Sequence, residues 1–153
     1  MVCDFNEKYV ENVTCELKGL RRQYIVANLE ADTIGVFKNF SVHIKIYKFY
    51  NQFRPFLVDV KLNVCDVINK KSTSNFYGNT VVRLMAKYTS IIKCPVIGHI
   101  FIRNFELKVD YFKDIMEDGK YRFNFIFFET MEWLGNLTLY GEILTNYRRL
   151  KTA

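Results

Sequence analysis

The sequence has few residues that interrupt regular secondary structure, and it has no long apolar run. Of its 153 residues only 2 are Pro and 7 are Gly, whereas 14 are Phe and 10 are Tyr. A hydrophobic fraction of 50% argues against intrinsic disorder. Charged residues interrupt every window of the roughly 20 residues that a membrane-spanning helix requires. We therefore expect one soluble domain over residues 1–146, followed by a basic tail over residues 147–153.

The sequence also lacks the residue groupings that enzymes and metal sites require. Its two histidines, His43 and His99, lie in strand-like segments, and its four cysteines form no CxxC pair. A metal site would need close pairs of Cys or His ligands. Catalysis would need converging nucleophiles and bases. We expect no metal, no cofactor and no enzymatic activity.

The positive charge does not follow the pattern of a nucleic-acid-binding protein. The formal net charge is +6, but the basic doublets at 21–22, 70–71 and 148–149 are far apart and no basic helix is evident. We expect a solvated basic surface and no nucleic acid. Attraction to an anionic membrane or an acidic partner remains an alternative.

The clearest pattern lies in residues 40–65, where two alternating segments flank a polar break. Val42, Ile44 and Ile46 alternate with polar residues before Asn51-Gln52, and the segment 58–64 alternates in the same way after it. Period-2 alternation predicts a hairpin with one buried face. Pro55 cannot donate to a sheet ladder, so we expect it on an edge strand or at a strand start.

Similar alternation predicts further strands at 24–31, 97–109, 121–128 and 137–143, with an edge strand or loop before residue 15. We expect turns at 19–22, 117–119 and 135–136. Apolar residues recur at helical spacing from Val81 to Ile92, which predicts one amphipathic helix near 80–92. About seven strands and one helix indicate a mostly β, two-sheet antiparallel sandwich of immunoglobulin-like type.

The four cysteines favour two disulfides and an oxidising compartment, although four free thiols in a cytosolic protein stay an alternative. Three N-x-S/T triplets agree with secretion and predict glycosylation at Asn12, Asn39 and Asn136. Met1 is followed by Cys3 and a polar segment, without the apolar core of a signal peptide. We therefore expect the signal peptide to be absent from this chain.

A family resemblance rests on the residues around this hairpin. The string from Tyr50 to Leu57, the alternating segment after it and Cys65 resemble a family of secreted insect domains that includes the chemosensory CheB proteins. That family is related to the ML lipid-recognition domains. Tyr140-Gly141-Glu142-Ile143 matches the glycine within the family's last strand. The resemblance implies a sandwich of ML type that can hold an apolar ligand between its sheets.

The many aromatic residues allow two interpretations. Taken singly, they are expected in the core: Tyr47, Phe49, Phe53, Phe56, Phe123, Phe125 and Phe127. Taken together with the resemblance, they predict an apolar cavity for a lipid or similar molecule, with the helix near its mouth. The expected lining residues are Val58, Val60, Leu62, Val64, Leu84, Tyr121, Phe123, Phe125 and Phe127.

The competing function is a monomeric adaptor domain with a solid core that acts on a membrane receptor or channel. Its contact surface would include the basic doublets and exposed aromatics such as Trp133. Either function would be extracellular, and chemosensation is the process that the resemblance implies.

For the disulfides we expect Cys3 to pair with Cys15 and Cys65 to pair with Cys94. The second bond would attach the predicted helix to the sheet, and related ML domains carry a bridge at this point. Cys3 and Cys15 then remain for each other. The open alternative is that Cys3 reaches a later strand, which would allow a bond between Cys15 and Cys94.

Overall fold

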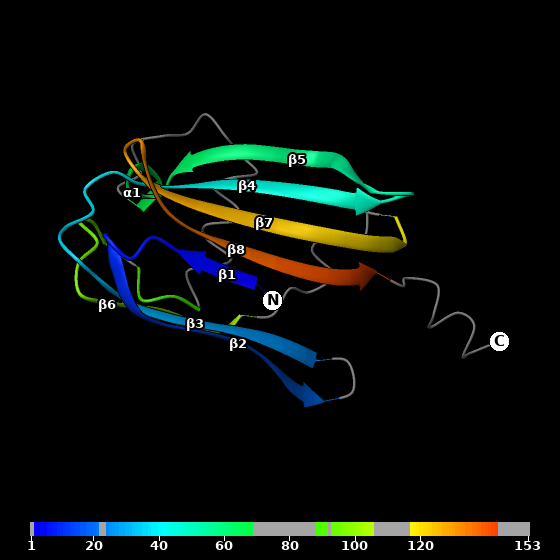
Figure 1. The fold of residues 1–153 in the computed structure, drawn as a ribbon, viewed down its shortest axis with the longest axis horizontal. Coiled ribbons are helices and arrows are strands. Elements are labelled where there is room, and N and C mark those ends of the chain that lie inside the picture. Colours follow the sequence, from blue (N-terminus) through cyan, green and yellow to red (C-terminus); the bar gives the residue numbers. More distant parts are fainter. Residues whose placement is uncertain (1, 22–23, 69–87, 92, 106–116, 144–153) are drawn as a thin grey trace.

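The computed structural model describes residues 2–21, 24–68, 88–91, 93–105 and 117–143, which form two layers (Figure 1). The first elements along the chain are β1 (Val2–Phe5), β2 (Val10–Arg21), β3 (Tyr24–Thr33), β4 (Phe40–Phe49) and β5 (Phe53–Asn63). They are followed by α1 (Val64–Ile68), β6 (His99–Phe105), β7 (Gly119–Glu129) and β8 (Glu132–Ile143). The expected tail at 147–153 lies outside the described residues.

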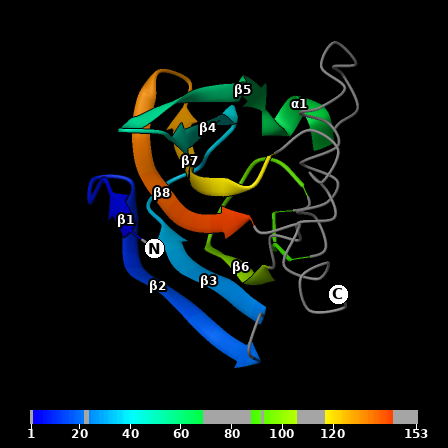
Figure 2. The ribbon, with the colours of Figure 1, turned by 90° about the vertical axis from the view of Figure 1, so that its right-hand side faces the viewer.

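The strands form two antiparallel sheets. The large sheet has the order β1-β8-β7-β4-β5, and the small sheet has the order β2-β3-β6. The two sheets face each other, and β1 and β2 lie at one side while α1 and β6 lie at the other (Figure 2). This arrangement confirms the predicted two-sheet antiparallel β-sandwich.

The core forms because alternate side chains of each strand point toward the opposite sheet. On β4, Val42, Ile44 and Ile46 are buried, and the residues between them are only partly so. Ile44 pairs across the sheet with Phe125 on β7, which in turn pairs with Leu137 on β8. Rows of this kind, repeated along the large sheet, supply most of the apolar surface that the small sheet covers.

The predicted hairpin at 40–65 is confirmed as β4 and β5. Strand β4 ends at Phe49 and β5 begins at Phe53. Across the turn between them, the Tyr50 amide donates to the Gln52 carbonyl (3.1 Å). Pro55 lies on β5, the edge strand of the large sheet, as its missing donor requires. The Asn63 side chain accepts from the Asp66 amide (3.0 Å) and caps the start of α1.

The predicted turn at 135–136 is wrong. The chain turns at Thr130-Met131, and Gly135 lies inside β8, opposite Phe127. Thr130 adopts a positive φ of 56°, a conformation that usually belongs to Gly or Asn. Gly135 instead serves close packing, because a Cβ at this position would overlap the ring of Phe5.

The segment before residue 15 was expected to be an edge strand or a loop, and it contains an edge strand. This strand is β1, at the edge of the large sheet. The segment also contains the start of β2, which continues to Arg21 through the predicted turn at 19–22. Each strand joins a different sheet, since β1 pairs with β8 and β2 pairs with β3.

Most of the predicted helix at 80–92 falls outside the described residues. Residues 88–91 are described and are not helical, because Thr89 forms a β-bridge with Ile102 and the Ser90 amide donates to the Phe101 carbonyl (3.0 Å). Within the described part of the chain, α1 is the one helix, and the sequence pattern did not indicate it.

Candidate functional site

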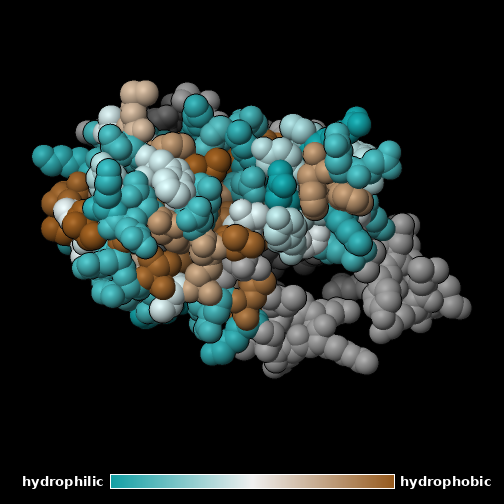
Figure 3. Space-filling view, in the orientation of Figure 1, coloured by the Kyte–Doolittle hydropathy of each residue, from teal (hydrophilic) through white to brown (hydrophobic). Residues whose placement is uncertain are grey.

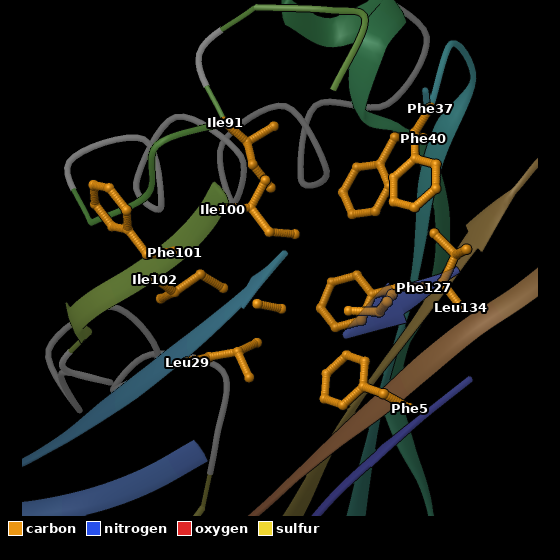
Figure 4. A pocket seen from close by; sticks show the side chains of 12 residues that line it. Phe5, Leu29, Phe37, Phe40, Ile91, Ile100, Phe101, Ile102, Phe127 and Leu134 are labelled. Atoms are coloured by element: carbon orange, nitrogen blue, oxygen red, sulfur yellow. The ribbon is translucent and has the colours of Figure 1, made fainter. Parts of the chain in front are cut away.

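An apolar cavity lies between the two sheets (Figure 4). Its volume is about 40 Å³, counted as room for the centre of a water molecule, within a hollow of about 460 Å³ that includes space open to solvent. The described residues around it are all apolar: Phe5, Val10, Leu29, Ala31, Phe37, Phe40, Ile91, Ile100, Phe101, Ile102, Phe127 and Leu134. Such a space offers no hydrogen-bond partner from its side chains and suits an apolar group.

Both sheets position the lining residues through the alternation of their strands. From the large sheet, Phe40 on β4 stacks on Phe127 of β7, with ring centroids 5.8 Å apart. Phe37 continues this stack beside Phe40 at 6.3 Å. Leu29 and Ala31 on β3 face these rings from the small sheet, as do Ile100 and Ile102 on β6. Most of the phenylalanine rings therefore come from the large sheet and the loop at Phe37, and the small sheet contributes mainly aliphatic side chains together with Phe101.

Phe37 is fixed by a bridge between two loops. Its amide donates to the Val96 carbonyl (2.9 Å), and the Val96 amide donates back to the Phe37 carbonyl (2.8 Å). Both side chains point inward and are buried. The residue before Phe37, which is Val36, and the residue after Val96, which is Ile97, point outward and are exposed. Figure 3 shows apolar residues gathered at this end of the molecule, on the left of the view. The surface beside the cavity is therefore apolar too.

The described cavity includes little of the predicted lining. Of the eight predicted lining residues that the structure describes, only Phe127 contacts this cavity. The other described ones pack in the core or against it: Val58, Val60, Leu62, Val64, Tyr121, Phe123 and Phe125. Leu84 lies outside the described residues. The prediction that these side chains of β5 and β7 face inward is correct. The described cavity, however, lies closer to the turn between β7 and β8.

Three aromatic residues that were expected in the core lie on the outer face of the large sheet. They are Tyr47, Phe49 and Phe53, near the turn between β4 and β5. Tyr47 follows a bulge in the pairing of β4 with β5 and pairs with Arg122, an outward residue of β7. Phe56, Phe123 and Phe125 do belong to the core or pack against it, as expected.

At the far end of the inner face, Lys48 is buried with 6% of its surface exposed. Its ammonium group donates to Glu117 (2.6 Å) and lies 5.4–5.8 Å from the ring centroids of Tyr50, Phe56 and Tyr121. The hydrogen bond to Glu117 is the main cause of the raised pKa of Lys48. A lysine that is held charged by a carboxylate and three rings is not a nucleophile, so we assign it a structural role.

A charged cluster ties β3 to β6 on the outer face of the small sheet. Arg103 donates to Glu30 (2.7 Å), and His99 Nδ1 lies 2.7 Å from Asp32 Oδ1. Asn12 also donates to Asp32 (2.9 Å). The bond from Arg103 is the largest cause of the lowered pKa of Glu30, and the bond from Asn12 is the largest cause of the lowered pKa of Asp32. The cluster satisfies its own charges.

We predict that this cluster makes stability fall at low pH. Because the folded-state pKa values of Glu30 and Asp32 are depressed, the stabilisation is complete above the ordinary carboxyl pKa of about 4. It is lost as the pH falls through the lowered values. In urea denaturation, the Glu30→Gln/Asp32→Asn double variant should lose less of its stability between pH 6 and pH 3 than the wild type.

The control is Glu16→Gln, which removes an exposed carboxylate of β2 that makes no ion pair in the described structure. It should keep the pH dependence of the wild type. If Glu16→Gln reduced the pH dependence of stability as much as the double variant does, a specific role for the cluster would be contradicted.

Both predicted disulfides are present, Cys3 with Cys15 and Cys65 with Cys94. The first joins β1 of the large sheet to β2 of the small sheet. The second joins α1, which follows the edge strand β5, to the segment that leads into β6. Each bond therefore connects the two layers, and the two bonds lie at opposite sides of the sandwich (Figure 2).

The three predicted glycosylation residues differ in their surroundings. Asn39 is exposed before β4, and Asn12 is exposed on β2 with its amide group bonded to Asp32. Asn136 is half-buried on β8, where its Oδ1 accepts from the Trp133 indole (2.8 Å). Attachment of a glycan at each of these residues stays a prediction.

Among the described residues, no three His, Cys, Asp or Glu side chains gather in a way that could hold a metal ion. Within the same ranges, no helix has the length and apolar character needed to cross a bilayer. His43 lies on the outer face of β4 and bonds to Asp59 of β5.

The comparison with known proteins gives a family. None of the curated proteins matches the chain. Residues 42–123 match a family described as "Protein of unknown function (DUF1091)". The match begins in β4, includes the central hairpin and the Cys65–Cys94 bond, and ends in β7. Because it spans more than half of the chain, this protein belongs to the DUF1091 family.

Proposed function

We propose that this protein is a secreted, non-enzymatic binding protein that holds a small apolar molecule between its two sheets. The observation that carries the proposal is the cavity, whose twelve lining residues are all apolar and come from both sheets. A lipid-like chain or another small hydrophobic compound fits this chemistry, because it needs no polar partner. Among the described residues no titratable side chain lines the cavity, and this supports the binding of an apolar group.

The small size of the cavity favours a narrow ligand. Ligand pockets usually measure about 300–1,000 Å³, whereas the enclosed space here is about 40 Å³. We therefore propose a single hydrocarbon chain or a molecule of similar width. The apolar loop surface at Val36 and Ile97 lies beside the cavity and offers such a ligand an apolar approach.

Secretion and a chemosensory role complete the proposal. Two disulfides support an oxidising compartment, and the three N-x-S/T triplets agree with it. The resemblance of the string from Tyr50 to Leu57 to insect CheB proteins and, more distantly, to ML lipid-recognition domains supports the choice of ligand and process. We propose that the chain acts as a monomer.

The test uses cis-parinaric acid, a single unsaturated hydrocarbon chain whose fluorescence rises in an apolar site. We expect saturable binding by the wild type and binding that is about 10-fold or more weaker in Ala31→Leu, because added methylenes occupy the site. Ala31 is 2% exposed and lines the cavity. The added atoms extend toward the cavity, so we expect the free energy of unfolding to fall by less than it does at a fully packed position.

Ala27→Leu is the matched control. Ala27 faces inward from the same strand and is also buried, but it does not line the cavity. We expect overpacking to lower its free energy of unfolding by about 1–3 kcal/mol while probe binding stays close to that of the wild type. Equal probe binding by all three proteins would place the probe elsewhere and remove the support for the carrier function.

A further inference from the structure

The outer face of the large sheet carries an aromatic cluster around Arg122. Tyr121 and Phe123 point into the core, so Arg122 between them points outward. Its partners across the sheet are Tyr47 on β4 and Tyr140 on β8. The guanidinium carbon lies 4.3 Å from the ring centroid of Tyr47 and 5.0 Å from that of Phe53. The guanidinium is therefore held against two rings rather than extended into water.

Further rings extend this surface. The Phe53 ring is tilted against Tyr140, with centroids 5.9 Å apart, and meets Phe49 edge-on at 5.2 Å. Phe49 and Tyr140 are 43% and 54% exposed. Exposed tyrosine and phenylalanine around an arginine are the composition of protein-binding hot spots. We refer to Tyr47, Phe49, Phe53, Arg122 and Tyr140 as the Arg122 cluster.

The charge of Arg122 has no counter-ion in the described structure. Its Nε is buried without a hydrogen-bond partner, and no carboxylate of the described residues forms an ion pair with it. Arg103 shows the contrasting arrangement. It also stacks on a ring, 3.8 Å from the centroid of Phe101, but its Nε donates to Glu30 at 2.7 Å. Among the described residues, a carboxylate is therefore paired with Arg103 and none is paired with Arg122.

Two lysines lie on the same face as Arg122, and each has a carboxylate opposite it across the sheet. Lys120 lies two residues before Arg122 on β7, opposite Glu142 of β8. Lys45 lies on β4 between Asn124 of β7 and Asp59 of β5. Neither lysine forms an ion pair within the described ranges. Asp59, the nearby carboxylate of β5, is already bonded to His43.

The exposed rings indicate what kind of anion fits. A free phosphate ion would use only the guanidinium group of Arg122. An acidic peptide segment would in addition cover the apolar surface of Phe49 and Tyr140, which are 43% and 54% exposed.

We propose that the Arg122 cluster binds an acidic segment of a protein partner, with a partner carboxylate on the Arg122 guanidinium. The planar fork of arginine matches a carboxylate with two parallel hydrogen bonds. The rings hold that fork in place before binding, so little side-chain freedom is lost when the partner arrives. This surface is on the outside of the large sheet, and its function does not depend on the cavity.

The test measures binding of fluorescein-labelled hexaglutamate by fluorescence anisotropy in 50 mM salt. We expect a dissociation constant below about 1 mM for the wild type. Arg122→Gln should weaken binding about 10-fold or more, because it removes a charge-assisted pair. Arg122→Lys keeps the charge but loses the fork, so we expect an intermediate loss. Urea denaturation of each variant shows whether the fold is kept.

Arg103→Gln is the matched control, since it removes the same charge from another stacked arginine. We expect it to bind the peptide within about 2-fold of the wild type. Equal losses in Arg103→Gln and Arg122→Gln would show that only net charge matters and would overturn the proposal. So would the absence of saturable binding at 1 mM peptide, or displacement of the peptide by an equal concentration of inorganic phosphate.

Discussion

Replacement of Phe125 by alanine is expected to lower the free energy of unfolding by about 3–5 kcal/mol, which is the usual cost of deleting a buried ring. Phe125 is 6% exposed and lies in the middle of the large sheet, between Ile44 and Leu137. The small sheet covers it, so the vacated space cannot collapse easily. Urea denaturation of the purified variant measures the loss, through a lower midpoint at an unchanged slope.

Phe128→Ala is the control on the same strand. Phe128 points to the outer face, opposite Ser41 and Trp133, and is only partly buried. Its removal should cost no more than about 1–2 kcal/mol, because less apolar surface returns to water. If Phe128→Ala lowered the free energy of unfolding as much as Phe125→Ala does, the outer face of the sheet would have to be packed as tightly as the inner face.

The second large effect is expected from the Cys65–Cys94 bond. The Cys65→Ala/Cys94→Ala variant should be about 3–4 kcal/mol less stable than the wild type, because the bond closes a loop between residues 29 apart in the sequence. Without it, the unfolded chain gains conformational freedom and α1 loses its covalent attachment to the segment before β6. Thermal or urea denaturation without reductant measures the difference.

The Cys3→Ala/Cys15→Ala variant provides the comparison. It opens a loop between residues only 12 apart, so we expect a smaller loss of about 3 kcal/mol. If the Cys65→Ala/Cys94→Ala variant instead unfolded at the urea concentration of the wild type, the bond would contribute nothing to stability.

Much of the fold could be predicted because strand alternation is a local property. Val42, Ile44 and Ile46 are buried as their spacing indicates, and the turn near Asn51-Gln52 lies where the polar break predicts it. Pro55 on an edge strand follows from its missing donor alone. The pairing of the four cysteines also agreed with the order of the elements along the chain.

The prediction failed where a distant contact decides the local structure. Gly135-Asn136 has the composition of a turn, but Gly135 lies in β8 because the Phe5 ring packs against it from β1. Residues 5 and 135 are far apart in sequence, so no local pattern shows their contact. Thr130-Met131 is not a typical turn sequence, yet the pairing of β7 with β8 places the turn there.

The candidate sites were harder to predict than the fold. A cavity depends on how two sheets meet, and the sequence gives no information about which inward side chains leave a gap. The sequence indicates part of the Arg122 cluster, because Arg122 alternates with buried aromatic residues and must therefore point outward. Its stacking on Phe53 required the bulge between Lys45 and Tyr47, which shifts the register of β5 against β4.

The positions of the two disulfides limit how far the two sheets can move apart. One bond joins the layers at the β1 and β2 side, and the other joins them at the α1 and β6 side. The layers therefore cannot separate at either side while both bonds are intact. Under the proposed function, this sets a covalent upper limit on the width of a ligand between the sheets, and reduction of either bond relaxes that limit.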